Sequence, residues 1–311
     1  MKTTKPSFNV LADPKKIRNE SPVQVSAMMK RLDKVLSSNE LDFSEFKSTL
    51  IALYHFKDTG VFKEAMIELR KHNEVISTGC TMQGRAFEKK YGYAGDFEII
   101  DKIYTEYISE NKLYAMWDRY FHEQPAPIAV RNRKKYFISK MSKLYKDMDI
   151  RVLNLASGPC RDILELLNLY DQPKFEFDCV ELDKNAIEYA RKLLDEHKSQ
   201  IKFINKNIFR FTPTKNYDVI WSAGLFDYFD DKTFVRILKR ILDSNPNSKI
   251  IIGNFSDENP TMPYMELIGE WFLHYRGKDR LRHLALQAGA NSKSICIESE
   301  SENVNLFLNI N

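Results

Sequence analysis

The side chain best suited to chemistry in this sequence is Glu181, which ends the apolar run Cys179-Val180-Glu181 about twenty residues beyond Gly158. An acidic residue at this spacing accepts hydrogen bonds from both ribose hydroxyls of a nucleoside. A helix cap is the other use for an acidic residue here, but Asp183 already suits the cap of the helix that begins near Asn185. The spacing therefore predicts nucleoside binding at Glu181.

A turn of small residues, Ala156-Ser157-Gly158, follows the apolar run that ends at Leu155. Such a turn between a strand and a helix lets backbone N–H groups approach a ligand. The three glycines of a dinucleotide fingerprint are absent, which disfavours an NAD enzyme. Asn154 and Ala156 stand where the acidic residue and the first glycine are usually found.

Two further segments complete the predicted cofactor site. Asn207 follows a third apolar run, where this type of sheet presents an Asp or Asn side chain to adenine, and Ser222-Ala223 follows a fourth. Ligands of such sheets lie beyond the carboxyl ends of the strands. The predicted cofactor-binding residues are Arg133, Ala156, Ser157, Gly158, Glu181, Leu182, Asn207, Ile208, Ser222 and Ala223.

The elements that must position these residues alternate between short apolar strands and amphipathic helices. Strands are predicted at 150–155, 175–181, 201–204, 217–222, 249–254, 294–298 and 304–310, and helices at 160–169, 185–196, 232–243 and 264–275. The last two strands form a hairpin at the sheet edge. The fold class is therefore α/β: a class I methyltransferase Rossmann-like sheet of seven strands, mostly parallel with an antiparallel last strand. This fold predicts S-adenosylmethionine as the cofactor.

The first part of the chain has a helical pattern instead. Apolar residues recur at three- and four-residue steps in five stretches: 25–36, 43–56, 61–76, 97–108 and 128–145. Domains are predicted at 1–126, a helical cap over the active site, and at 127–311, the Rossmann-like domain whose first strand begins near Asp149. The segment Tyr91-Gly92-Tyr93-Ala94-Gly95-Asp96-Phe97 interrupts the helices, and fits either a plain junction or an active-site loop.

Composition narrows the function classes. The 311 residues include 47 basic and 43 acidic side chains, too even a balance for a nucleic-acid partner. The spacing of the four cysteines does not suit a metal site. No apolar run is long enough for a membrane span, and Met1 to Lys16 lacks the apolar core of a signal peptide. We expect a cytoplasmic protein with a small-molecule partner, and an oligomer is compatible with the sequence.

Several motifs resemble one bacterial methyltransferase family, which makes 3-hydroxypalmitic acid methyl ester. They span Tyr91 to Ile310: Tyr91-Gly92-Tyr93-Ala94-Gly95-Asp96-Phe97-Glu98, Glu123-Gln124-Pro125, Ala129-Val130-Arg131-Asn132-Arg133, Gly158-Pro159, Gly224-Leu225-Phe226-Asp227-Tyr228, Asn254-Phe255 and Trp271-Phe272-Leu273-His274-Tyr275-Arg276. The resemblance leaves out Met1 to about Ser77. It favours the active-site interpretation of the Tyr91 loop, and implies a fatty-acyl acceptor.

The resemblance implies that the acceptor atom is a carboxylate oxygen. A carboxylate is ionised at neutral pH and needs no base, which agrees with the lack of an evident acid–base pair in the sequence. A fatty carboxylate needs an anchor, and Arg276, at the end of the predicted helix that follows the fifth strand, offers a two-pronged fork. The predicted catalytic residues are Tyr93, Asp96, Tyr228, Asn254 and Arg276, with Arg133 as a further anchor candidate.

Three alternatives stay open. A hydroxyl acceptor would use His122 or His274 as the base. An aminopropyltransferase would hold a polyamine with Asp227, Asp230 and Asp231, although the last two also suit a helix cap. The third alternative is a catalytically silent module that only binds S-adenosylmethionine.

Overall fold

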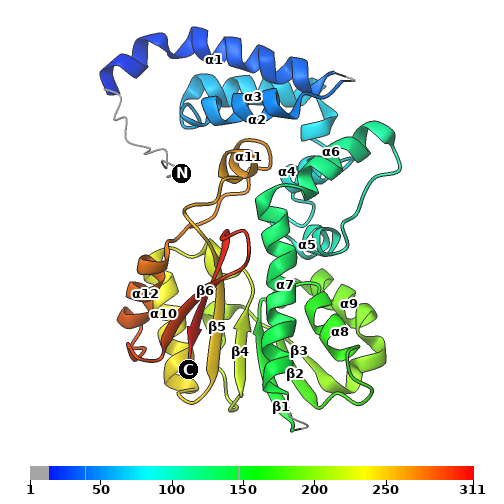
Figure 1. Ribbon diagram of the computed structural model, residues 1–311, viewed down its shortest axis with the longest axis vertical. Helices are drawn as coiled ribbons and strands as arrows, with labels where there is room; N and C mark the ends of the chain where they lie inside the picture. Colours follow the sequence, from blue (N-terminus) through cyan, green and yellow to red (C-terminus); the bar gives the residue numbers. More distant parts are fainter. Residues whose placement is uncertain (1–13, 39, 146–147) are drawn as a thin grey trace, which may run out of the picture. The chain divides into compact units, whose positions relative to one another are not determined.

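The computed structural model describes residues 14–38, 40–145 and 148–311, and the chain divides into two compact units, Met1–Ser77 and Thr78–Asn311 (Figure 1). The described part of the first unit contains α1 (Pro14–Leu36), α2 (Phe43–Tyr54), α3 (Gly60–His72) and the 3-10 helix η1 (Glu74–Ile76). Three of the predicted apolar stripes are thus helices, with Leu32, Phe46 and Leu50 buried. The prediction for Met1 to Lys16 lies largely outside the described residues.

The second unit is built on one seven-stranded sheet of order β3-β2-β1-β4-β5-β7-β6. The strands are β1 (Ile150–Leu155), β2 (Phe175–Glu181), β3 (Ile201–Asn205), β4 (Val219–Ser222), β5 (Lys249–Phe255), β6 (Ile295–Ser299) and β7 (Asn305–Ile310). β1 to β5 are parallel, whereas β7 is antiparallel to both β5 and β6. The predicted fold class and the predicted edge hairpin are confirmed.

Helices cover both faces of this sheet (Figure 1). On one face, α10 (Asp231–Ser244) and α12 (Lys278–Gln287) pack against Ile250 and Ile252 of β5. On the other, α7 (Pro125–Leu144), α8 (Arg161–Leu167) and α9 (Lys184–Leu193) pack against residues that include Trp221 and Ile251. Successive residues of a strand point to opposite faces, so strands buried on both sides appear as continuous apolar runs.

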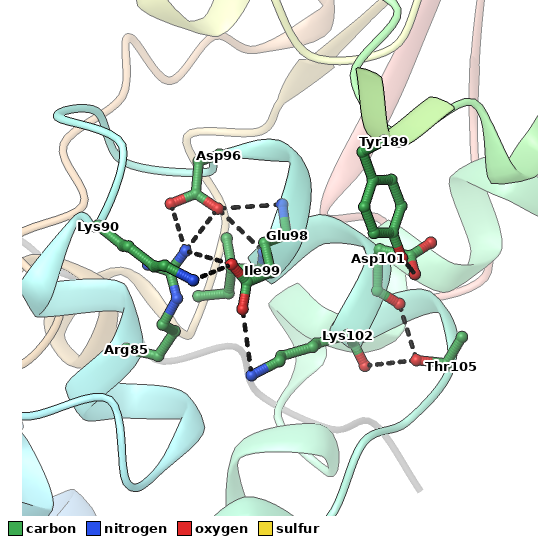
Figure 2. Close-up of polar contacts among 9 residues, drawn as sticks. All are labelled: Arg85, Lys90, Asp96, Glu98, Ile99, Asp101, Lys102, Thr105 and Tyr189. Carbon is green, nitrogen blue, oxygen red and sulfur yellow. Dashed lines mark hydrogen bonds and ion pairs between the residues drawn. The ribbon is translucent and has the colours of Figure 1, made fainter. Parts of the chain in front are cut away.

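Three helices precede α7 in the second unit: α4 (Met82–Glu88), α5 (Phe97–Tyr104) and α6 (Lys112–His122). The buried carboxylate of Asp101 joins α5 to the sheet layers, because it accepts hydrogen bonds from Arg161 on α8 and Tyr189 on α9. Figure 2 shows Tyr189 beside Asp101. The division at Ser77 and Thr78 places these helices with the sheet. From sequence we predicted the domain boundary between residues 126 and 127. That residues 1–126 form a cap over the active site stays a prediction.

The predicted helix 264–275 is wrong. Helix α11 (Met262–Leu267) ends early, and non-helical chain leads to α12, which the sequence pattern did not predict. Glu270 has a left-handed backbone (φ 45°), which an α-helix does not accommodate. Beyond it, the N–H of His274 donates to the carbonyl of Asp227 and that of Arg276 to the carbonyl of Phe255. These longer-range bonds replace the helical ones.

Candidate active site

A cavity of about 560 Å³ lies at the carboxyl ends of the parallel strands. The segments that follow β1, β2, β3 and β4 line one part of it, through Ala156, Leu182, Asn207 and Ala223. The remaining wall comes from α4 to α7, the loop between α4 and α5, and the segment around α11. All the lining residues belong to the second unit, and the first of them is Gln83.

The turn after β1 has the open backbone that a close ligand requires. Ala156, Gly158 and Cys160 all have positive φ angles between 53° and 57°. A Cβ atom at Gly158 would meet nothing within 4 Å, so space remains beside this turn. Within the described residues, both polar side-chain atoms of Asn154 and the hydroxyl of Ser157 are buried without a hydrogen-bond partner. Unpaired buried polar groups are rare in proteins and indicate a missing ligand or water.

Glu181 stands at the end of β2, at the edge of the cavity. Its carboxylate accepts the N–H groups of Gly158 (2.9 Å), Leu182 (2.8 Å) and Asp183 (3.0 Å). Burial raises the pKa of Glu181 although these three bonds favour the charged form. The side chain of Asp183 accepts from Asn185 N–H and caps α9, as the sequence predicted.

Most of the other predicted cofactor-binding residues also line the cavity, namely Arg133, Ala156, Ser157, Gly158, Leu182, Asn207, Ile208 and Ala223. Asn207 caps the 3-10 helix η3 (Ile208–Arg210) through its side-chain oxygen. Ser222 differs, because it is not among the described residues that line the cavity. Its hydroxyl is buried and donates to the carbonyl of Leu155.

Three buried charged groups meet on one side of the cavity: Arg133 of α7, Asp162 of α8 and Asp227 of the 3-10 helix η4 (Phe226–Tyr228). Burial raises the pKa of Asp162 to about 6 and that of Asp227 to about 7, against the pull of Arg133. Burial alone would lower the pKa of Arg133. The neighbouring Tyr104 and the two carboxylates outweigh that effect, so the pKa of Arg133 is raised. Our sequence prediction did not include Asp162, and considered Asp227 only as a polyamine ligand.

The loop between α4 and α5 forms another wall of the cavity. The hydroxyl of Tyr93 donates to Asp183 (3.0 Å), and that of Tyr228 donates to the carbonyl of Ala94 (2.8 Å) and accepts from the indole of Trp271. A Cβ atom at Gly95 would lie 2.5 Å from the hydroxyl oxygen of Tyr228, so only glycine fits there. The predicted catalytic residues Tyr93 and Tyr228 therefore both face the cavity.

Asp96 is placed differently. Its carboxylate is buried, caps α5 through the N–H groups of Glu98 and Ile99, and accepts two bonds from Arg85 at 2.9 and 2.8 Å (Figure 2). Among the described residues it is absent from the cavity wall. The geometry makes Asp96 a support of the loop, in place of the catalytic contact that we expected.

Asn254 and Arg276 are likewise drawn into the structure behind the cavity, and neither is among the described residues that line it. The guanidinium of Arg276 donates to Asp231, to Asn254 and to the carbonyls of Phe226, Phe229 and His274. Its donors are thus occupied around η4, and it does not offer a fork to an acceptor. Arg276 is also not on a helix, which corrects our prediction for it.

The alternative site residues have structural partners. His122 bonds the carbonyl of Tyr107, and the backbone of His274 bonds Asp227; neither histidine is among the described cavity-lining residues. Asp230 caps α10, and Asp231 pairs with Arg276 and Arg280. Of the three carboxylates considered for a polyamine, Asp227 alone lines the cavity within the described chain.

The cavity wall away from the strand ends is largely aromatic and aliphatic. It includes Tyr91, Phe97, Ile100, Ile103, Phe121, Val130, Tyr264, Met265, Trp271 and Leu273. Its polar member Gln83 is buried and accepts a hydrogen bond from Tyr264 (2.6 Å). Such a wall suits an apolar ligand, since it offers few hydrogen-bonding groups.

Comparisons with known proteins agree with this architecture. Residues 152–244 match the methyltransferase domain family. The methyltransferase pynC of Aspergillus niger is 25% identical over 189 residues, which are 58% of this chain and 51% of pynC. The chain thus spans about half the length of this curated relative.

Among solved structures, a possible exported protein from Bordetella parapertussis is similar over 96% of this chain and 98% of its own, with a TM-score of 0.61 and 15% identity. The mitomycin 7-O-methyltransferase MmcR is similar over 95% and 96%, with a TM-score of 0.46 and 13% identity. The sheet order defines the class of fold: the second unit has the Rossmann-like fold of class I methyltransferases, and its residues 152–244 match the methyltransferase domain family.

Proposed function

We propose that this protein is an S-adenosylmethionine-dependent O-methyltransferase that acts on a small, largely apolar acceptor. The observation that carries the proposal is the cavity itself, in which the nucleoside-type residues at the strand ends share one space with an aromatic and aliphatic wall. Relatives named as methyltransferases agree with it.

The residues present fit this cofactor. Glu181 and Asn207 would hold the ribose and the adenine, and the unpaired polar atoms of Asn154 and Ser157 offer partners to the methionyl end. Arg133, whose Nε atom is buried and without a partner among the described residues, would pair with the methionyl carboxylate. The bound cofactor supplies a methyl group on a positively charged sulfur, a leaving group that needs no further activation.

The chain's own residues contribute positioning and the exclusion of water. Tyr93, Tyr228 and Trp271 fix the loop that walls the cavity. Alignment of this kind contributes up to about 7–11 kcal/mol to a displacement reaction. In the described residues no three His, Cys, Asp or Glu side chains form a metal site, and no helix is long and apolar enough to cross a membrane.

Two kinds of acceptor oxygen are compatible with this proposal. The resemblance to the fatty-acid ester family supports an acyl chain with a carboxylate. Arg133 is the remaining anchor candidate for it, and would then have to bind this carboxylate as well as the methionyl carboxylate of the cofactor. A hydroxyl acceptor requires a proton acceptor, and the cavity contains Asp227 for that role.

The test is incubation with methyl-labelled S-adenosylmethionine and a cell lipid extract. We expect label in a small apolar product, and mild alkaline treatment then separates a labile ester from a stable ether. Binding of the cofactor without labelled product from any extract would instead support the silent module. A thermal-shift comparison with decarboxylated S-adenosylmethionine tests the aminopropyltransferase alternative.

A further inference from the structure

The carboxylate of Asp227 has one oxygen committed to the fold and one available. Oδ1 accepts the N–H of Phe255 at 2.6 Å, which ties η4 to β5. Within the described residues, the hydrogen bond of this carboxylate goes to Oδ1 and none goes to Oδ2. A Cβ atom at Gly224 would lie 2.7 Å from Arg133 Nη1 and 3.4 Å from Oδ2, so the glycine keeps side-chain atoms out of the space beside these two groups at the cavity wall.

The charges around Asp227 keep this carboxyl near the balance between its two protonation states. Burial raises its pKa to about 7, while the Phe255 N–H bond and the charges of Arg133 on α7 and Arg276 before α12 oppose that rise. Tyr228 is the next residue, and Tyr104 and Asp162 lie beside Arg133. A carboxyl that titrates close to neutrality is well suited to proton transfer.

We propose that Asp227 accepts a proton from a hydroxyl group of the acceptor, so the substrate is an alcohol or a phenol. This inference rests on the methyltransferase function proposed above. The acceptor oxygen forms the bond to the methyl carbon, the carbon–sulfur electron pair leaves with sulfur, and the hydroxyl proton passes to Oδ2. The products are a methyl ether, the neutral thioether of the cofactor and a protonated Asp227.

The same position of Asp227 disfavours a carboxylate acceptor. An ionised Asp227 would repel a second carboxylate brought to the same side of the cavity. Arg133 can offset only part of that repulsion, since Asp162, Asp227 and, in the complex proposed above, the methionyl carboxylate of the cofactor already share this one guanidinium. A hydroxyl group avoids the repulsion and can donate its hydrogen bond to Oδ2.

The first experiment needs no acceptor. S-adenosylmethionine has a positive sulfur and S-adenosylhomocysteine a neutral one, so only the former should favour the ionised form of a nearby Asp227. Calorimetry at pH 7 in phosphate and in Tris measures the protons released by each ligand. We expect the whole chain to release more protons with S-adenosylmethionine, and Asp227→Asn to abolish this difference.

Asp230→Asn is the matched control, because Asp230 caps α10 outside the cavity and asparagine also caps helices. The Asp230→Asn protein should retain the difference in proton release between the two ligands. Equal proton release with both ligands in the unchanged protein overturns the inference, and that comparison needs no variant to fold. Failure of both ligands to bind would instead remove the proposed function.

The second experiment uses 4-hexylphenol and decanoic acid as probes with labelled cofactor. We expect an alkali-stable ether from the phenol, with a single-turnover rate that rises with pH and levels off by about pH 7, because bound S-adenosylmethionine shifts the pKa of Asp227 below its ligand-free value of about 7. Asp227→Asn should lower that rate by about 100-fold or more and remove its pH dependence. Transfer to decanoic acid alone, with a rate independent of pH, would overturn the inference.

Discussion

At the scale of single residues, Glu181 has two roles: its carboxylate accepts three backbone N–H groups, and it faces the cavity. We expect Glu181→Ala to weaken S-adenosylmethionine and S-adenosylhomocysteine by roughly 1–3 kcal/mol, the range for a lost buried hydrogen-bond partner. Calorimetry measures this, with Glu176→Ala on the exposed side of β2 as the control. Unchanged affinity in a folded Glu181→Ala protein would remove the ribose assignment.

The raised pKa of Asp227 also predicts how the stability of the fold depends on pH. Its folded pKa, about 7, lies above the unfolded value of about 3.9, so the native state binds more protons between these two values. The stabilisation that protonated Asp227 provides is complete below about pH 4 and is lost as pH rises to about 7. Asp227→Asn should therefore flatten the fall in Tm between pH 5 and 8. A slope equal to that of the unchanged protein would contradict the raised pKa.

At the scale of elements, the loop between α4 and α5 depends on its two glycines for different reasons. Gly92 and Gly95 both have positive φ, at 84° and 68°, and alanine should destabilise either by roughly 1–2 kcal/mol. A Cβ atom at Gly95 would also lie 2.6 Å from the Trp271 ring, whereas one at Gly92 meets nothing within 4 Å. Gly95→Ala should displace the cavity wall, lower kcat and change the fluorescence of Trp271. Equal effects of the two substitutions would show that the contact with Trp271 is unimportant.

Arg276 links two elements of the structure behind the cavity. Its guanidinium ties β5 and η4 together through several carbonyl oxygens, and a lysine ammonium cannot reach all of them. We expect Arg276→Lys to lower the free energy of unfolding by roughly 1–3 kcal/mol. Urea unfolding measures this, and Arg280→Lys, at an exposed ion pair with Asp231, should cost less than about 1 kcal/mol. Reduced turnover with normal stability would restore Arg276 as an acceptor anchor.

At the scale of the whole molecule, the cavity belongs to the second unit. A chain that starts at Thr78 should bind S-adenosylhomocysteine as tightly as the full chain, because every lining residue lies in 78–311. A chain that starts near Ile128 loses α4, α5 and α6 and should lose turnover, even where it folds and binds the cofactor. Calorimetry and methyl-transfer assays on both chains measure this. Full activity of the shorter chain would assign 78–127 to interaction instead.

Local sequence patterns determined the sheet and most of the proposed cofactor site. The inner strands β1, β2, β4, β5 and β7 were evident from the sequence, because strands buried on both faces contain mostly apolar residues. The edge strands β3 and β6 were also predicted, although they are less buried and include polar residues. Glu181 and Asn207 follow directly from those strands, since a parallel sheet brings its carboxyl ends to one edge. Residue type and spacing along the chain were sufficient there.

Only the tertiary structure decided which polar residues face the cavity. Arg276 and Asp227 occur in neighbouring motifs, yet the first is surrounded by carbonyl oxygens and the second lines the cavity. That outcome depends on Glu270 ending the predicted helix, and on bonds such as Arg276 N–H to Phe255 across more than twenty residues. The protonation of Asp227 is set by burial and by Arg133 and Arg276, which approach it from elements distant in sequence. Periodicity cannot predict such groupings, because burial and charge pairing arise only when those elements pack together.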